Sequence, residues 1–463
     1  MYFTTLQGTK QIVQDSDYYK RIKQKQYKDL FLDKTNFIIH SILQGNQHLY
    51  KSNKLEAVPL HNDILLHQVG RNYQSVFNVL FEAGIVETNG SYTVGEHSKR
   101  YKLTKKALEY NIVKVGILHK NTIKKYETFR RNLLSSLLKD KDIAKQFYSI
   151  TDLYYNPPAD IDAFLDELIG TEITEQRMHY LDWHKQLVQF NSFRTKEDYA
   201  NSNFYIMRCK KTGRIYNTYT HIPKAFRSRL TSRDKEELVE VDGKNSQLYI
   251  LANMFYIASN NIDDAYIKNI RYTNKIINNN IKRLNIYSSI CMQDVPEATT
   301  LLKNLYNTNY DFYNNFIQVK NDLGLQEKIP TNNRSEIKPY VLKAIYGYYN
   351  NELSTEEEVL KVMYPNLLKF IRSTKKKLGT LQIDKASASN KLFAHIIQNI
   401  ESNIYVKRFF SKLQVGKLAF SVHDSIVCKK QDEAYVRDLL VDSIIEEFKD
   451  IKLNPITINK IIK

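Results

Sequence analysis

Two short apolar stretches, far apart in the chain, each carry one aspartate where a strand should end. The first runs from Leu238 to Asp242, and a turn and the apolar helix Leu248 to Phe255 are expected after it. The second, Leu418 to Cys428, is apolar on both sides of His423-Asp424-Ser425, which predicts a hairpin with an acid at its tip. An aspartate at a strand end is usually a turn residue, so neither acid is diagnostic alone.

Residues 57 to 110 follow a different pattern. Asn62 to Val69 predicts a short helix, and Arg71 to Ala83 predicts an amphipathic helix with Val76, Val79 and Leu80 on one face. Alternation around the turn Asn89-Gly90, from Ile85 to Leu103, then predicts a hairpin.

Helix, helix and hairpin in this order are typical of a winged helix-turn-helix. Its second helix would enter a major groove, and the wing would carry Lys99 and Arg100 toward phosphates. The alternative is a small winged fold that serves only packing or protein contact.

The remaining segments read as mainly helical. Residues 1 to about 50 predict polar helix with lysine runs, and residues 111 to 200 predict a helical region. Residues 255 to 330 are read as a helical insertion. The acidic cluster Asp160-Ile161-Asp162 follows Pro157-Pro158, which favours a structural role in a first helical turn. The alternative, an exonuclease carboxylate set, lacks the further spaced acids that it needs.

Net charge changes the expected partners. The chain carries a formal charge of +18 and 33 tyrosines. Such an excess attracts polyanions, above all nucleic acid, and tyrosines among lysines suit base stacking. The alternative is a lysine-rich proteome from an AT-rich genome, with the charge merely solvated.

Targeting signals and cysteine usage point to the cytoplasm. No stretch of about 18 apolar residues predicts a membrane span, and Met1 to Thr5 does not resemble a secretory signal. The three cysteines are far apart and odd in number, which argues against a cysteine-based zinc site.

A third segment lies between the two aspartates. Arg334 and Lys338 are four residues apart and share a helical face, and Tyr346-Gly347 follows two turns later. Two cations on one face suit a triphosphate, and a tyrosine there can stack beside a nucleotide. The alternative is a solvated helix face. Two carboxylates on adjacent strands, Asp242 and Asp424, can share two Mg2+ ions, with Mn2+ as a substitute.

In order and spacing, the three segments resemble motifs A, B and C of the family A polymerases, which include DNA polymerases and single-subunit phage RNA polymerases. Motif A corresponds to Asp242, motif B to Arg334, Lys338 and Tyr346-Gly347, and motif C to His423-Asp424-Ser425. Two further segments are similar to the family's accessory elements, Thr212-Gly213-Arg214 and the helix that carries Gln398, Glu401 and Lys407. Small phage or mobile-element proteins that join a winged helix to such a palm are also similar.

The resemblance implies an α+β right-hand fold with an N-terminal winged domain. The expected parts are an N-terminal domain at 1–110, a thumb-like helical region at 111–200, a palm from 201–254 and 381–463, and fingers at 255–380. The palm would hold an antiparallel sheet, and the fingers and thumb would be helical.

The resemblance also implies residue roles. Asp242 and Asp424 would bind metal. Arg334 and Lys338 would hold the triphosphate, and Lys338 would also protonate the leaving pyrophosphate. Tyr346 would sit against the nascent base pair. Three residues, Arg214, Gln398 and His423, are expected at the primer-template duplex.

Two features depart from the family pattern. Pro339 disfavours helical geometry at Lys338, so the helix is expected to start there or to kink. Gln247 stands five residues after Asp242, where the DNA polymerases place a glutamate that blocks the ribose 2′-hydroxyl and RNA polymerases place a small residue. Gln398 and the short distance from Arg214 to Asp242 favour DNA synthesis, whereas Asp242-Gly243 and His423-Asp424-Ser425 are more like the RNA enzymes.

Three functions therefore compete. The first is a DNA-templated DNA polymerase for replication of a phage or mobile element, without a proofreading exonuclease, using dNTPs and a primer-template. The second is a small RNA polymerase or primase that uses NTPs. The third is a non-catalytic replication initiator that binds DNA through the winged helix.

Overall fold

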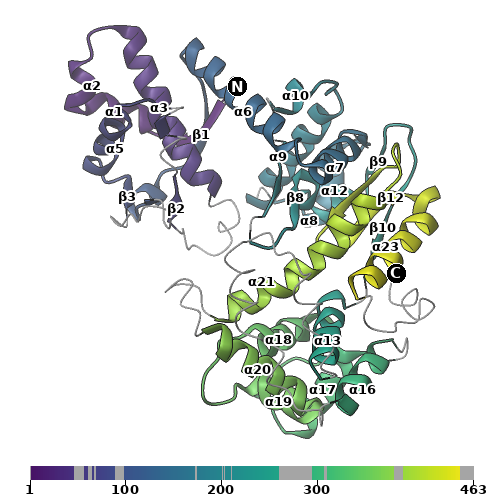
Figure 1. The fold of residues 1–463 in the computed structure, drawn as a ribbon. Helices are drawn as coiled ribbons and strands as arrows, with labels where there is room; N and C mark the ends of the chain where they lie inside the picture. The colour runs from purple at the N-terminus through teal and green to yellow at the C-terminus, as the bar shows by residue number, and fades with distance from the viewer. Residues whose placement is uncertain are drawn as a thin grey trace. The chain divides into compact units, whose positions relative to one another are not determined.

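The computed structural model describes most of the chain and divides it into two units, Met1–Leu134 and Ser135–Lys463. The described residues are 2–45, 57–60, 65–66, 69–88, 99–172, 175–200, 202, 204–209, 211–243, 245–259, 295–306, 310–379 and 389–448. They form an α+β protein of many helices and small antiparallel sheets, as expected (Figure 1). Among them, no helix combines the length and the apolar character that a membrane crossing requires.

The first unit contains two small sheets around the long helix α3. Its helices are α1 (Thr9–Asp15), α2 (Asp17–Arg21), α3 (Lys25–Gly45), α5 (Tyr73–Glu82) and α6 (Lys120–Leu137), with a 3-10 turn at Lys106–Glu109. Its strands are β1 (Tyr2–Leu6), β2 (Val58–Pro59), β3 (Val86–Thr88), β4 (Arg100–Leu103) and β5 (Ile112–Gly116).

This unit extends past the expected boundary at residue 110. β5 pairs antiparallel with β1, from Tyr2 opposite Gly116 to Leu6 opposite Ile112. Because this pairing joins the first strand to a strand beyond residue 110, the segment from 111 to 134 belongs to the N-terminal unit. The polar-helix reading of residues 1 to 50 was wrong in part, since β1 is a strand and α3 buries Ile38, Ile39 and Ile42.

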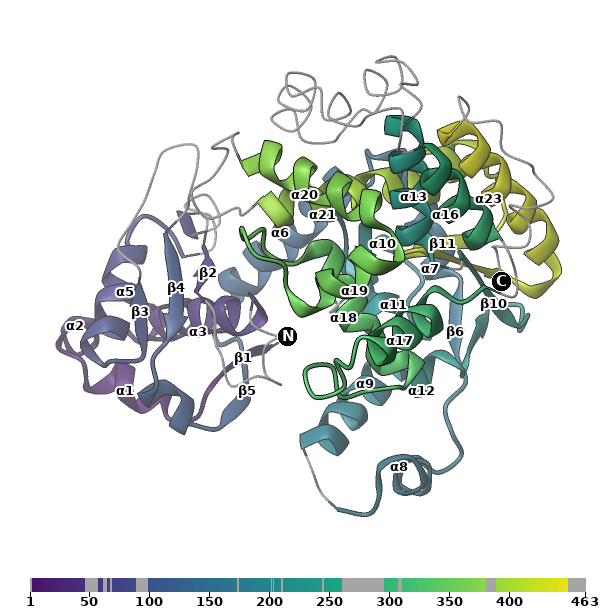
Figure 2. The same cartoon turned by 90° about the horizontal axis from the view of Figure 1, so that it is seen from below.

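The second sheet of this unit has the order β2-β4-β3, with β4 in the middle (Figure 2). α5 packs against it and buries Val76, Val79 and Leu80, the face that the sequence predicted. The expected hairpin is present as β3 paired with β4, but Asn89-Gly90 and most of the expected helix at 62–69 lie outside the described residues. Phe77 stacks on Tyr101 with ring centroids 4.2 Å apart, which ties helix to sheet.

The second unit is built on the three-stranded antiparallel sheet β10-β12-β11. Its strands are β6 (Leu153–Tyr155), β7 (Ile206–Arg208), β8 (Ile215–Asn217), β9 (Leu230–Ser232), β10 (Leu238–Asp242), β11 (Ala419–Val422) and β12 (Ser425–Lys429). The remaining strands form two two-stranded sheets, β6-β9 and β7-β8.

Helices surround this sheet and extend from it. Those before residue 245 are α7 (Lys141–Thr151), α8 (Ile161–Ile169), α9 (Glu175–Phe190), α10 (Lys196–Ala200), α11 (Thr218–His221) and α12 (Lys224–Arg227). Those after it are α13 (Ser246–Ser259), α16 (Val295–Tyr306), α17 (Phe312–Asp322), α18 (Arg334–Tyr346), α19 (Thr355–Met363), α20 (Pro365–Gly379), α21 (Ser389–Ser402), α22 (Phe409–Lys412) and α23 (Glu433–Glu447). Figure 1 shows α13 and α16 to α20 grouped near one end of α21.

The edge strand β11 is covered rather than exposed. The Gln146 side-chain carbonyl on α7 accepts hydrogen bonds from the Ser421 backbone N–H and from its hydroxyl, each 3.1 Å long. The Ala419 N–H donates to Ser149 of the same helix over 3.1 Å. Because α7 occupies the polar groups of this edge, the sheet does not present them to another chain.

The acidic cluster near residue 160 has the structural role that its position predicted. The Asp160 side chain caps α8 by accepting from the N–H groups of Asp162 and Ala163. Asp162 and Asp166 both pair with Arg177, at 2.8 and 2.6 Å. These carboxylates are therefore engaged in holding α8 and α9 together. Cys209 and Cys428 are free thiols, and Cys291 lies outside the described residues.

Candidate active site

The three-stranded sheet brings Asp242 and Asp424 together at one end. Asp242 is the last residue of β10 and lies opposite Ser425, the first residue of β12. Val422 pairs with Ser425, so only His423 and Asp424 form the turn between β11 and β12. The Gly243 N–H donates to the Asp424 carbonyl over 3.4 Å. The backbones of Asp242 and Asp424 are thus adjacent at one end of the sheet.

The tight turn sets the backbone of His423. Its φ of 56° is left-handed, as two-residue hairpin turns commonly require. Its ring lies edge-on to Tyr216, with centroids 5.7 Å apart. His423 is exposed, but desolvation by its neighbours and the nearby Arg214 charge lower its pKa. The imidazole is therefore disposed to be neutral at pH 7 and to act as a hydrogen-bonding group beside Asp424.

A glycine after Asp242 is required by close packing. A Cβ built on Gly243 would overlap the hydroxyl of Tyr405. Tyr405 is fully buried, and burial raises the pKa of its phenol well above the ordinary value. It belongs to the π-helical segment Asn403–Arg408 that continues α21, and such turns often occur at functional sites. The sequence contained no signal for Tyr405, because its contact depends on a helix about 160 residues away from Gly243.

Behind the aspartates lies a buried ion pair between Arg214 and Glu401. The Arg214 side chain is 11% exposed and that of Glu401 is fully buried. Burial raises the pKa of Glu401 to about 7, Arg214 opposes the rise, and the charges of Asp424 and Asp242 add to it. Glu401 Oε1 and Arg214 Nε have no hydrogen-bond partner within the described part of the chain. Arg214 was expected at a duplex surface, but the structure places its guanidinium in this pair.

Helix α21 also holds the turn that carries Arg214. The Asn399 amide donates to the Lys211 carbonyl over 2.6 Å, and Gly213 in the same turn has a left-handed φ of 73°. Gln398, the neighbouring residue, is half-buried. The helix therefore contributes Asn399 and Glu401 to the site's framework. Glu401 was expected on this helix, but only Gln398 was expected to make a contact, and Asn399 was not identified from the sequence.

Helix α18 begins at Arg334, with the Asn333 side chain as its cap, and it runs through Pro339 to Tyr346. A helix start at Lys338 was therefore wrong. The earlier start is supported by Lys320, whose buried ammonium group binds the Ile329 and Thr331 carbonyls at 3.2 and 2.8 Å and so holds the loop before the cap.

The cations of α18 are both accessible. Lys338 is exposed. Arg334 is half-exposed, pairs with Asp311 at 2.6 Å and lies over the Tyr313 ring, 5.0 Å from its centroid. Burial raises the pKa of Tyr313, and Arg334 opposes the rise. The charge of Asp424 contributes to the rise, so Tyr313 lies within electrostatic reach of Asp424.

A hydrogen bond links α18 to α13, the helix that follows the strand of Asp242. The Tyr346 hydroxyl donates to the Gln247 side-chain carbonyl over 2.9 Å. Burial raises the pKa of Tyr346 far above its ordinary value, so the phenol stays neutral and remains a donor. Gln247 is in the first turn of α13, and Asn245 before it adopts a left-handed φ of 57°. The two residues that the sequence placed near a nucleotide are in direct contact.

The expected nucleic-acid contacts of the first unit lie at the start of β4. Lys99 and Arg100 are both exposed, and the Lys99 carbonyl accepts from the Leu60 N–H over 3.3 Å. Their side chains therefore remain on the surface, as the wing prediction requires.

The sequence predicted that Asp242 and Asp424 would bind a metal ion. Within the described ranges, no group of three or more His, Cys, Asp or Glu side chains is suited to hold a metal ion. A two-carboxylate set fits Mg2+, which proteins commonly hold through one or two carboxylates, with water and substrate phosphates as further ligands.

Comparison with protein families and with curated proteins found no match to this chain.

Proposed function

We propose that this chain is a template-directed nucleotidyl transferase with a right-hand fold, most similar to the family A polymerases, and that it makes DNA. The observation that carries the proposal is the adjacency of Asp242 and Asp424 at one end of an antiparallel sheet. Helix α18, which presents Arg334 and Lys338, is linked to the segment just after Asp242 by the hydrogen bond from Tyr346 to Gln247. In this proposal the sheet is the palm and the helices grouped with α18 are the fingers.

The metal chemistry would come from Mg2+ held by the two aspartates. Two such ions, or Mn2+ in their place, would activate a primer hydroxyl and stabilise negative charge on the leaving pyrophosphate. The half-exposed Arg334 and the exposed Lys338 would bind the triphosphate, and Lys338 would donate a proton to the pyrophosphate. Tyr346 and Gln247 would contact the nucleotide as one hydrogen-bonded unit.

The duplex contacts need a revised assignment. Because Arg214 is buried with Glu401, it would position the site by supporting the turn next to α21 instead of approaching the duplex directly. Gln398 and the exposed His423 remain the proposed contacts to a primer-template. The element order of the first unit, with sheet order β2-β4-β3, supports a winged helix that also binds DNA.

Two other functions remain as alternatives. A single-subunit RNA polymerase or primase would share this site and differ in sugar choice. A non-catalytic replication initiator would use the winged helix and would not need Asp242, Arg334, Lys338, Tyr346 and Asp424 together. We propose that the enzyme is cytoplasmic. We also propose that it lacks proofreading, because the acids near residue 160 cap α8 and pair with Arg177 of α9.

Primer extension tests the proposal. The wild type should extend a primed DNA template with Mg2+ or Mn2+. Asp242→Asn and Asp424→Asn should each abolish extension while leaving duplex binding nearly unchanged. Asp322→Asn is a matched control, because this exposed aspartate on α17 loses the same charge in the same unit. Full activity in either site variant, or no activity of the wild type with dNTPs and NTPs alike, would contradict the proposal.

A further inference from the structure

The first unit has two hollows on either side of Lys34, and neither belongs to the site described above. The aromatic hollow, of about 430 Å³, is lined by Tyr18, Tyr27, Phe31 and Lys23 among others. The lysine hollow, of about 410 Å³, is lined by Lys124, Lys125, His119 and Gly70 among others. Leu30 and Lys34 line both. The two hollows therefore form one surface along α3.

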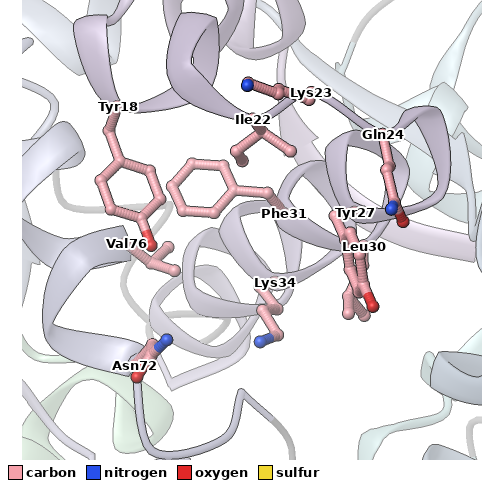
Figure 3. A pocket seen from close by; sticks show the side chains of 10 residues that line it. All are labelled: Tyr18, Ile22, Lys23, Gln24, Tyr27, Leu30, Phe31, Lys34, Asn72 and Val76. Atoms are coloured by element: carbon pink, nitrogen blue, oxygen red, sulfur yellow. The ribbon is translucent and has the colours of Figure 1, made fainter.

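Aromatic rings are available in the first hollow. Figure 3 shows Tyr18 and Phe31 on one side, Tyr27 and Leu30 on the other, and Lys34 between them. Tyr18 stacks on Phe31 with centroids 4.9 Å apart, yet it remains 39% exposed, and Tyr27 is 54% exposed. An exposed tyrosine next to lysines can stack on an unpaired base, because every base offers a π-face.

The charge of this surface is strongly positive and unopposed. Neither hollow is lined by an aspartate or glutamate among the described residues. Asp33, the acid next to Lys34, is buried and accepts the N–H groups of Leu118 and His119, at 2.9 and 2.8 Å. Burial and the charge of Lys125 both lower the pKa of Lys34. An anion between these lysines would relieve a repulsion that the protein leaves in place.

We propose that the two hollows on α3 bind single-stranded nucleic acid, with a base against Tyr27 and Tyr18 in the aromatic hollow and backbone phosphates against Lys34, Lys124 and Lys125. This site is separate from the wing residues Lys99 and Arg100, and it depends on the first unit alone, not on the function proposed for the second. The ligand is a single strand because the bases of a duplex are paired and stacked, and their faces are not free for tyrosine.

Fluorescence anisotropy with the full chain tests the site. All proteins carry Asp242→Asn, so that no synthesis takes place and a failure of the proposed polymerase activity cannot affect the result. The probes are an oligothymidylate of about 20 nucleotides, an abasic strand of equal length and a blunt duplex. Lys34→Gln should weaken binding of both single strands about five-fold near 0.1 M salt. It should also reduce the magnitude of the slope of log K against log salt concentration by about 0.7.

The control variants separate phosphate contact from general charge. Lys25→Gln removes the same charge from an exposed position of α3 outside both hollows and should change affinity much less. Lys124→Gln should act like Lys34→Gln. Tyr27→Ala should weaken the base-bearing strand by about five-fold or more and leave the abasic strand unchanged. Burial of Lys34 and its repulsion from Lys125 both destabilise the folded protein. Lys34→Gln should therefore keep or raise the melting temperature.

Three results would overturn the inference. Equal losses for Lys34→Gln and Lys25→Gln would reduce the effect to net charge. If Tyr27→Ala leaves the single-strand affinity unchanged, and Lys34→Gln lowers the duplex affinity as much as the single-strand affinity, the surface binds the duplex backbone. If affinity does not depend on strand length, and thymidine monophosphate at equal nucleotide concentration abolishes binding, the surface is a site for a small nucleotide.

Discussion

The contact between Tyr346 and Gln247 predicts how strongly the proposed site discriminates between deoxyribonucleotides and ribonucleotides. In the proposed site, the Gln247 side chain lies under C2′ of the incoming sugar, and the Tyr346 hydroxyl fixes its orientation through a 2.9 Å hydrogen bond. A long side chain there leaves no room for a 2′-hydroxyl. Gln247→Ala removes both the bulk and the acceptor, and it should raise ribonucleotide use by about 10- to 100-fold, or roughly 1.4 to 2.7 kcal/mol of differential transition-state binding.

Tyr346→Phe tests the hydrogen bond separately. A neutral hydrogen bond contributes about 0.5 to 1.5 kcal/mol net, so this variant should lose discrimination by about 10-fold or less. The double variant should discriminate no worse than Gln247→Ala, because the hydroxyl acts through Gln247. Gln318→Ala, an exposed glutamine on α17, is the matched control and should leave discrimination unchanged.

The assay is kcat/KM for one dNTP and its matching NTP on the same primer-template, for each variant. Deoxynucleotide use should change little. If Gln247→Ala lowers both activities equally and lowers the melting temperature, the side chain supports the fold and does not select the sugar. If the wild type already prefers NTPs and the variant leaves that preference unchanged, the chain is an RNA-synthesising enzyme and the steric reasoning is wrong.

Two further predictions concern stability. His40 is buried, its Nδ1 accepts the Thr4 N–H over 3.1 Å, and burial lowers its pKa to about 4. Because the folded pKa is below the unfolded value of about 6.5, the free energy of unfolding should fall by about 3 kcal/mol as pH falls between the two values. Urea unfolding at several pH values should show this loss, and His40→Asn should make the free energy of unfolding depend less on pH. The same pH dependence in His40→Asn as in the wild type would contradict the assignment. Gly243→Ala should lower the free energy of unfolding by about 1 to 3 kcal/mol, because the new Cβ overlaps the Tyr405 hydroxyl. Adding Tyr405→Phe should restore part of that loss in thermal unfolding. If the losses of the two single variants simply add in the double variant, the overlap is refuted.

The local pattern was sufficient for the strands that carry the two aspartates. Alternating and continuous apolar runs, broken at Asp242 and at His423-Asp424, predicted a strand with an acid at its end and a hairpin with an acid at its tip, and both are present. The amphipathic face of α5 and the structural role of the acids at 160 and 162 were predicted in the same way, although the capping by Asp160 was not. These features depend on residues within a few positions of one another, so period and turn chemistry are enough.

The partners of those residues were decided by tertiary structure. Arg214 and Glu401 are 187 residues apart, and they meet because the turn between β7 and β8 packs on α21, where Asn399 bonds the Lys211 carbonyl. The start of α18 at Arg334 depends on the loop held by Lys320, which outweighs the local preference of Pro339. The N-terminal boundary likewise depends on β5 reaching β1. Contacts between distant segments have no local period, because they arise only when separate elements bury their surfaces against one another.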